Sequence, residues 1–190
     1  MKLLFACLLL LLSQLGFSTQ ANLPPPVDIP IPNITQQTPV WCWAAVAQQI
    51  IAFKQGSART PAQCALVALS YATPPQYCCM AQQQCTTTGN LVQIQQLLWH
   101  FGGSVSSYAR PTDPLTLYAT LAQRKPIIMA IKSPYSHIGH VVVIRGMHFQ
   151  MTAQGPVAML HVNDPMNYVA TVVAFHQLAP MWTDAIVIHN

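Results

Sequence analysis

The stretch Gln36-Gln37-Thr38-Pro39-Val40-Trp41-Cys42-Trp43-Ala44-Ala45 decides how this chain folds, because it marks the point where a helix begins. Apolar residues recur at helical spacing from Cys42 to Lys54, and Gly56 follows as a stop signal. The pattern therefore predicts a helix that opens with Cys42. A free thiol with a pKa of ~8.5 is mostly protonated at neutral pH, and the positive end of a helix favours its reactive thiolate.

Three further helices are expected in the first two thirds of the chain. Pro61 and Pro114 each stand at a first helical position after a capping residue, and Asn90 is itself a typical cap. The expected helices cover about residues 60–71, 90–100 and 113–123.

After Pro126 the pattern changes to short runs rich in Val and Ile, separated by Gly and Pro. We interpret these runs as strands of one antiparallel sheet, at residues 127–131, 141–145, 157–162, 170–175 and 185–188. Helices in the first half and strands in the second are typical of an α+β domain. A site built from both halves is expected in the cleft between them.

A nucleophilic cysteine needs a base, and His140 is the best candidate. It begins an expected strand and follows Gly139, whose small size lets the backbone come close to the cleft. His137, three residues earlier in the loop, is the second choice, and His148, His161 and His176 are further possibilities. The opposite interpretation makes Cys42 a buried apolar residue and His140 a core histidine.

A carboxylate can orient such a histidine, and Asp164 follows the expected strand 157–162 directly before Pro165. Asn163 is the alternative. Adjacent residues of an extended chain point to opposite faces, so only one of the two can reach His140. We favour Asp164.

Gln36 is the candidate for stabilising an oxyanion, through its side-chain amide, with the backbone N–H of Cys42 as the second donor. Gln37 is the alternative, and we favour Gln36.

Four further cysteines, Cys64, Cys78, Cys79 and Cys85, cluster in the sequence after Cys42, which stands apart from them. A bridge between the adjacent Cys78 and Cys79 is strained. Two connectivities stay open: Cys64 to Cys78 with Cys79 to Cys85, or Cys64 to Cys79 with Cys78 to Cys85. A zinc site is disfavoured because the cluster has no Cys-x-x-Cys pair.

The N-terminus reads as an export signal. Lys2 precedes an apolar run, and small residues follow where a signal peptidase cuts, so residues 1–21 are interpreted as a signal peptide. Cys7 lies inside the apolar run, which disfavours a lipid anchor. We expect an extended, proline-rich arm at residues 22–35, one domain at 36–190, and a secreted or periplasmic protein.

The charge pattern excludes some partners. The chain has eight Lys or Arg and four Asp or Glu, for a formal net charge of +4, and the basic residues are scattered. The sequence therefore has no basic patch of the kind that indicates binding to nucleic acid. No stretch after the signal peptide is apolar enough to span a membrane.

The motifs together resemble the bacterial papain-like cysteine peptidases. They are Gln-x5-Cys-Trp at 36–43 with its Cys-Trp-Ala-Ala opening, Gly-His-Val-Val-Val-Ile at 139–144, and Asn-Asp-Pro at 163–165. They occur in the family's order across nearly the whole domain.

The resemblance implies a papain-like fold and hydrolysis of peptide bonds through an acyl-enzyme. It gives Cys42, His140 and Asp164 the roles of a catalytic triad and Gln36 that of the oxyanion glutamine, with no cofactor or metal. The expected partners are a protein or peptide substrate and an inhibitor or immunity protein. The alternatives are a cell-wall peptide amidase or transamidase with the same triad, and a catalytically silent peptide-binding domain.

Three features differ from the plant and animal branch of that family. Asp164 stands where that branch usually has Asn, and the arm is too short for an inhibitory propeptide. The four-cysteine loop is also unlike that branch, so specificity and regulation do not carry over.

Overall fold

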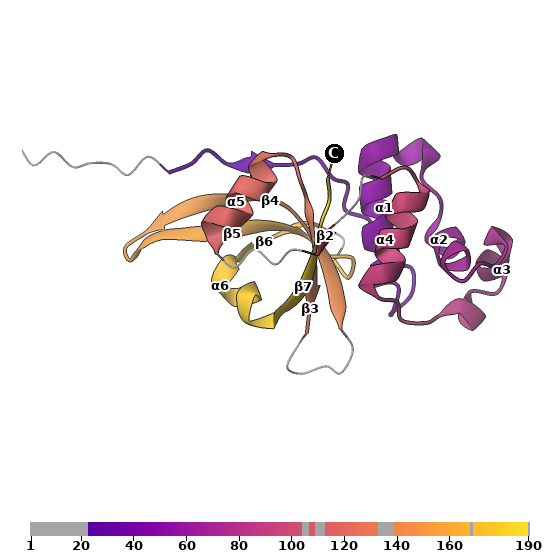
Figure 1. The fold of residues 1–190 in the computed structure, drawn as a ribbon. Helices are drawn as coiled ribbons and strands as arrows, with labels where there is room; N and C mark the ends of the chain where they lie inside the picture. Colours follow the sequence, from indigo (N-terminus) through magenta and orange to yellow (C-terminus); the bar gives the residue numbers. More distant parts are fainter. Residues whose placement is uncertain (1–22, 104–106, 109–112, 133–138, 168, 190) are drawn as a thin grey trace, which may run out of the picture.

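The first half of the described chain is helical and the second half forms a sheet, and the two lie side by side (Figure 1). This computed structural model describes residues 23–103, 107–108, 113–132, 139–167 and 169–189. The expected signal peptide 1–21, with Cys7, and the alternative base His137 lie outside the described residues. The arrangement confirms the expected α+β fold.

The helical layer begins with the helix that the opening motif predicts. Helix α1 starts at Cys42 and ends where Gly56 adopts a φ of +83°. Helix α4 follows Asn90, whose side chain and that of Gln93 form a capping box. The elements of this layer are α1 (Cys42–Gln55), η1 (Ser57–Arg59), α2 (Gln63–Ser70), α3 (Pro75–Met80), η2 (Gln82–Cys85) and α4 (Leu91–His100).

The second helix differs from its expected range, because α2 begins at Gln63 and not near Thr60. Thr60 and Ala62 are extended. The side chain of Gln48, on α1, donates a hydrogen bond to the carbonyl of Pro61 at 2.7 Å. This tertiary contact holds the chain extended where proline alone suggested a helix start.

Within the described ranges, the strands form one seven-stranded sheet in the order β2-β7-β3-β4-β5-β6, with β1 also paired to β4. Every described pairing is antiparallel. The strands are β1 (Val27–Asp28), β2 (Ser107–Tyr108), β3 (Ile127–Ile131), β4 (His140–Thr152), β5 (Gly155–Asn163), β6 (Thr171–Ala174) and β7 (Trp182–Val187). Three helical segments accompany it: α5 (Pro114–Ala122), α6 (Phe175–Leu178) and η3 (Ala179–Met181).

Helix α1 joins the two layers. It contacts α2 and α4 on one side and β4 on the other. Trp43, Val46 and Ile50 are at most 1% exposed, so the apolar face of the helix is buried within the core. Its first residue is thereby placed at the boundary between the helices and the sheet.

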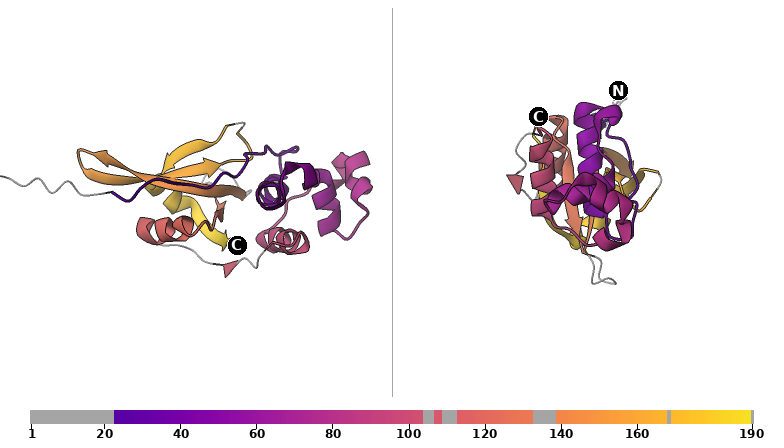
Figure 2. Two further views of the ribbon diagram at one scale, coloured as in Figure 1. Left: turned by 90° about the horizontal axis from the view of Figure 1, so that it is seen from above. Right: turned by 90° about the vertical axis from the view of Figure 1, so that its right-hand side faces the viewer.

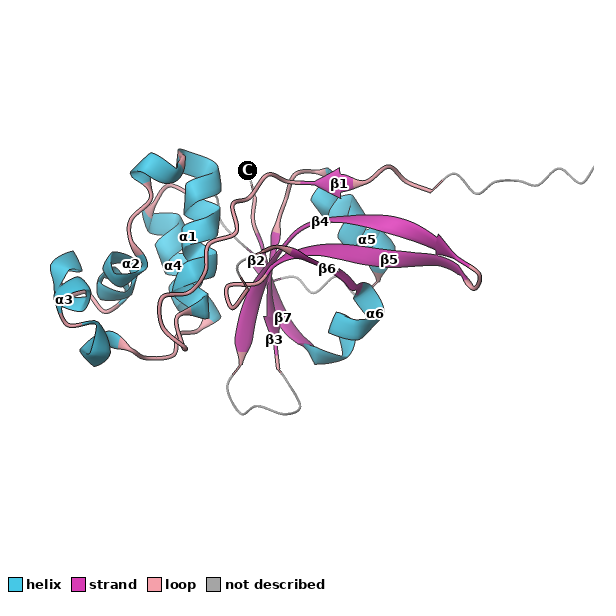
Figure 3. Ribbon diagram, turned by 180° about the vertical axis from the view of Figure 1, so that it is seen from behind, coloured by secondary structure: helices cyan, strands magenta, loops and turns pink. Residues whose placement is uncertain are grey.

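The described part of the N-terminal arm, residues 23–35, is extended and runs along the sheet to the helical layer (Figures 2 and 3). Ile29 and Ile31 are buried in the core. The N–H of Ile29 donates to the carbonyl of Arg145, on β4, at 2.9 Å. The side chain of Gln49, on α1, donates to the carbonyl of Ile34 at 3.0 Å. The arm therefore binds both layers.

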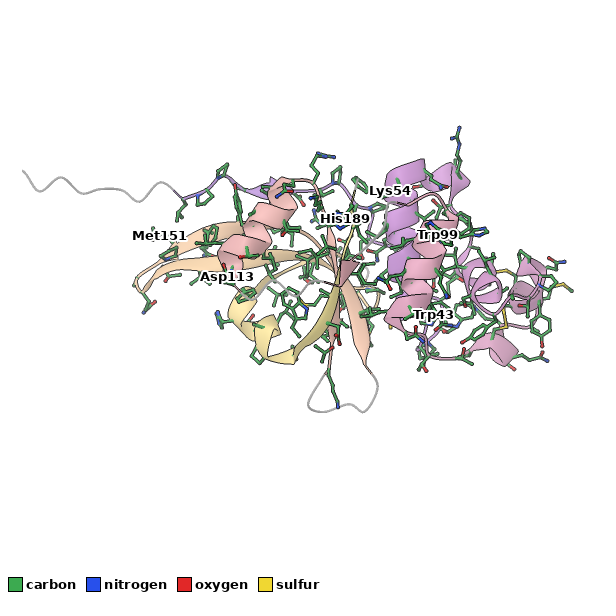
Figure 4. The ribbon with its side chains drawn as sticks, viewed as in Figure 1. Trp43, Lys54, Trp99, Asp113, Met151 and His189 are labelled. Carbon is green, nitrogen blue, oxygen red and sulfur yellow. A yellow bond between two sulfur atoms is a disulfide. The ribbon has the colours of Figure 1, made fainter. Side chains whose placement is uncertain are left out.

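The four clustered cysteines form two disulfides, Cys64–Cys79 and Cys78–Cys85, which is one of the two connectivities left open by the sequence. They join α2 to α3 and α3 to η2 (Figure 4). Disulfides indicate an oxidising environment. In the described part of the chain, no helix has the length and apolar character that crossing a membrane requires.

Candidate active site

Cys42 is the first residue of α1, half-buried, and the one free cysteine among the described residues. The N–H groups of a first helical turn have no acceptor within the helix, and they give that end a partial positive charge. No side chain caps this helix start. Its position is fixed by Trp41, whose indole N–H donates to the carbonyl of Cys85 at 3.0 Å.

His140 is the first residue of β4, and Asp164 follows the end of β5, the next strand of the sheet. Nε2 of His140 lies 2.7 Å from Oδ1 of Asp164, which leaves Nδ1 as the ring nitrogen for Cys42. The carboxylate also accepts hydrogen bonds from the N–H of Met166 at 2.9 Å and the amide of Asn167 at 3.0 Å. These contacts hold Asp164 in place behind the histidine.

The environment fixes the charges of this pair. Burial opposes a charge on His140, but hydrogen bonds and charge attraction from Asp164 and Cys42 outweigh it and raise the pKa of His140 from 6.5 to about 9. Burial likewise opposes the ionised form of Asp164, yet hydrogen bonds from His140 and the Met166 backbone hold the pKa of that carboxyl below its usual value. At neutral pH the pair is an imidazolium and a carboxylate.

Cys42 and His140 share the wall of a cleft of about 560 Å³ between the helices and the sheet. The wall is mostly apolar, with Lys132 and Asp184 as its other charged side chains. Its lining residues are Cys42, Trp43, Thr88, Gly89, Asn90, Leu91, Ile94, Ala130, Ile131, Lys132, Gly139, His140, Val141, Thr183 and Asp184. The expected cleft between the two halves is therefore present.

Gly89 allows the chain before α4 to lie directly on Trp43 at the cleft. A Cβ on Gly89 would come within 2.3 Å of the Trp43 ring, closer than real Cβ contacts allow. The indole N–H of Trp43 also donates to the carbonyl of Thr87 at 3.3 Å. The position of residues 87–89 is thus set by a residue of α1 one step from Cys42.

Gln36 lies beside this cleft rather than in its lining. Its Nε2 donates to the carbonyl of Thr38 at 2.8 Å, and its backbone N–H donates to the carbonyl of Pro165 at 2.9 Å. It lines a neighbouring hollow of about 300 Å³ with Pro39 and Met166. The amide nitrogen has a second N–H that the Thr38 contact does not use.

The alternative residues that the sequence offered, Asn163 and Gln37, make other contacts in the structure. Asn163 is fully buried, donates to the carbonyl of Ile31 at 3.0 Å, and accepts from Nε of Arg145 at 3.0 Å. It fastens the N-terminal arm, whereas Asp164 faces His140. Gln37 is exposed, and its backbone N–H donates to Oε1 of Gln63 at 2.9 Å.

Gln63 is a positioning residue that the sequence patterns did not single out. Its side chain is fully buried and, besides Gln37, binds the carbonyl of Thr35 at 2.7 Å and Oε1 of Gln48 at 3.0 Å. It thus holds the backbone on both sides of Gln36. One glutamine in a glutamine-rich chain carries no sequence signal for such a role.

No cluster of three or more His, Cys, Asp or Glu among the described residues is placed to hold a metal ion.

Comparisons with known proteins bear on the family and the fold of this chain. Residues 26–181 match the family model described as papain-like cysteine protease AvrRpt2. A similar solved structure is the proform of the Amb a 11 cysteine protease, a major ragweed pollen allergen, with a TM-score of 0.50 and 13% identity. The match covers 91% of this chain and 67% of that one, and it bears on the fold alone. No curated protein sequence matches the chain.

Proposed function

We start from the finding that this chain belongs to the family described as papain-like cysteine protease AvrRpt2 and is a cysteine peptidase. We propose that the protein is exported and that it cleaves protein substrates with Cys42 as the nucleophile. His140 carries the proton, Asp164 orients His140, and Gln36 binds the oxyanion. The observation that carries these roles is His140 at the cleft, bonded to Asp164 and charged beside Cys42.

In the first half-reaction, Sγ of Cys42 attacks the carbonyl carbon of the scissile amide as a thiolate. The imidazolium of His140 stabilises that thiolate before attack. When the C–N bond breaks, the leaving amine takes a proton from His140, and the acyl group remains on Cys42 as a thioester. His140 is then neutral and able to act as a base.

In the second half-reaction, a water molecule loses a proton to His140 and attacks the thioester carbonyl. The C–S bond breaks, the carboxylic acid product leaves, and the Cys42 thiolate is restored beside the imidazolium. Asp164 stabilises the charged ring throughout, which favours each state in which His140 holds the proton.

The negative charge on the carbonyl oxygen needs donors that are already in position. The N–H of Cys42, at the first helical position, has no acceptor within the helix. The second N–H of Gln36 is the other donor. Gln63 and the Pro165 carbonyl support this role because they fix the backbone around Gln36.

Substrate backbone can pair with the chain at the cleft wall. Thr88 and Gly89 line the cleft, and their backbone groups have no hydrogen-bond partner within the described ranges. An extended peptide that adds a strand here would satisfy them. This geometry favours unfolded or loop segments of proteins as substrates.

Alkylation of Cys42 tests the proposed pair in the chain without residues 1–21. The rate of reaction with iodoacetamide is measured from about pH 5 to pH 9 for the native chain, His140→Ala and His176→Ala. His176 is an exposed residue of α6 and serves as the matched control. The native chain and the control should react well below pH 7, whereas His140→Ala should react only at alkaline pH.

The same three chains and a fourth, Cys42→Ala, are then each incubated with a peptide library, and the products are identified by mass spectrometry. Cleavage should occur with the native chain and His176→Ala only. Equal alkylation profiles for the native chain and His140→Ala would refute the roles assigned to the pair.

A further inference from the structure

The cysteine-rich end of the helical layer carries a further, smaller hollow of about 170 Å³, here called the tyrosine pocket. Small-molecule sites usually measure ~300–1,000 Å³, so this one fits a single side chain rather than a free ligand. The tyrosine pocket is lined by Tyr71, Thr73, Tyr77, Cys78, Gln84, Cys85 and Thr87.

The walls of the tyrosine pocket are aromatic and uncharged. The hydroxyl of Tyr71 lies 2.6 Å from Oγ1 of Thr87, and that of Tyr77 donates to Oε1 of Gln84 at 2.9 Å. Because these hydroxyls are occupied, the rings are what an entering group meets. Tyr71 and Tyr77 are 44% and 48% exposed, so part of each side chain is open to a ligand from solvent.

The disulfides make the pocket rigid. Cys78 and Cys85, joined to each other, belong to its lining and are only 1% and 5% exposed. Cys64–Cys79 anchors the same helix, α3, to α2. A pocket whose shape is set by covalent bonds loses little conformational entropy when a side chain enters it.

The linings of the tyrosine pocket and of the active-site cleft contain residues that are adjacent in sequence. Thr87 lines the pocket, and the next two residues, Thr88 and Gly89, line the cleft. Two indole N–H groups from the start of α1 fix this segment, Trp41 to the carbonyl of Cys85 and Trp43 to that of Thr87. A substrate that pairs with residues 88 and 89 therefore lies next to a residue of the pocket lining, Thr87.

The catalytic geometry indicates which side of the substrate arrives there. The leaving amine receives its proton from His140, on the sheet, while the acyl part stays bonded to Cys42, on the helical layer. Residues 87–89 belong to the helical layer too. The pocket thus faces residues that precede the scissile bond.

We propose that the tyrosine pocket is a specificity site that binds an uncharged aromatic side chain of the substrate, upstream of the residues held in the cleft. The inference rests on the proposed peptidase function. Aromatic rings pack edge to face against tyrosine, and the pocket has no charged residue to pair with a charged side chain. The disulfide-linked segment would then select substrates as well as stabilise the fold.

The experiment uses a short peptide that the native chain cleaves, extended upstream by residues in which one Phe, Ala or Lys is moved from position to position. Values of kcat/KM are compared for the native chain, Tyr77→Ser, Gln84→Glu and Met80→Ser. Met80 lies on the same helix as Tyr77, is 85% exposed and does not line the pocket, so it is the matched control. Gln84→Glu keeps the acceptor for Tyr77 and adds a charge.

At one upstream position Phe should raise kcat/KM about tenfold over Ala, and Lys should give no gain. Tyr77→Ser and Gln84→Glu should lose the preference for Phe and keep full activity on the short peptide, whereas Met80→Ser should behave like the native chain. Equal kcat/KM for Phe and Ala at every upstream position overturns the proposal. It is also overturned if Tyr77→Ser lowers kcat/KM by the same factor on the short and the extended peptides.

Peptide affinity of Cys42→Ala separates this inference from the proposed function. Tighter binding of the Phe peptide, abolished by adding Tyr77→Ser, supports the pocket even if the cleavage roles prove wrong. Equal affinity for the Phe and Ala peptides in a chain that cleaves the short peptide overturns the pocket alone.

Discussion

Replacing Asp164 with Asn removes the negative charge beside His140 and leaves a side chain of nearly the same shape. Oδ1 of Asp164 lies 2.7 Å from Nε2 of His140, and the two side chains are only 22% and 19% exposed. The rise in the pKa of His140 from 6.5 to about 9 corresponds to about 3 kcal/mol, to which Asp164 and Cys42 both contribute. We expect the pKa of His140 to return toward 6.5 in Asp164→Asn.

The change in protonation sets the expected loss of activity. At about pH 8 a ring with a pKa of about 9 is roughly nine-tenths protonated, whereas one with a pKa of 6.5 is protonated in roughly one molecule in thirty. The imidazolium that stabilises the thiolate is then largely absent. The lower protonation alone corresponds to a fall in kcat/KM of about 30-fold, and the lost orientation of the ring should bring the total to about 10²- to 10⁴-fold.

Folding stability should follow the same pair, with a defined dependence on pH. The folded pKa of His140 lies above the ordinary 6.5, so its contribution is complete below pH 6.5 and disappears as the pH rises through about 9. Asp164 has a lowered folded pKa, so its contribution is present above the ordinary 3.8 and is lost as the pH falls. Between these limits the native chain should be more stable than Asp164→Asn by up to about 3 kcal/mol.

The assays are an NMR titration of the His140 ring, urea unfolding at about pH 5.5 and pH 10, and kcat/KM at about pH 8. Asp184→Asn is the matched control, because Asp184 is an exposed carboxylate of the same cleft. A titration of His140 that is the same in Asp164→Asn as in the native chain would refute the reasoning, and so would a stability difference that is as large at pH 10 as at pH 5.5.

Three further changes have definite expected outcomes. Gln36→Ala should lower kcat by about 10²- to 10³-fold with little change in KM, as measured by steady-state kinetics, and a loss confined to KM would contradict an oxyanion role. Gly89→Ala places a methyl group against the Trp43 ring and should cost about 1–3 kcal/mol in urea unfolding, so unchanged stability would show that this contact is looser than described. Reducing Cys64–Cys79, whose residues are 15 apart in sequence, should cost about 3 kcal/mol. A thermal midpoint that does not fall with reductant would count against this.

Local signals explain which elements the sequence predicts well. The start of α1 at Cys42 and the cap of α4 at Asn90 are set by residues within one helical turn, and β3 has the expected range 127–131. The start of α2 is set by the Gln48 contact to Pro61, which joins two separate elements. No pattern within one segment could reveal it.

Other differences have the same cause. Strand β4 extends to Thr152 because it pairs with β5 from Val143 to Thr152, and α3 is held by both disulfides. Strands β1 and β2 have two residues each, which is too few for a periodic pattern.

Within the candidate site, alternation along an extended chain predicts that only one of Asn163 and Asp164 can reach His140, and the two do face different partners. The choice between Gln36 and Gln37 cannot be made from such a rule, because both lie in an irregular loop. The contacts of that loop depend on Gln63 and Pro165, from other parts of the chain. Positions set by distant contacts are visible only in three dimensions.

The bonds that the N-terminal arm makes with Asn163 and Asn167 have a consequence for the time course of biosynthesis. They join residues near the start of the domain to residues made near its end, so they cannot form while the ribosome is still extending the chain. Cys42 is likewise made long before His140 and Asp164. With the roles proposed above, a nascent or truncated chain carries a thiol without its proton carrier, and we expect it to cleave substrates only after residues 163–167 have been made and the two layers have docked.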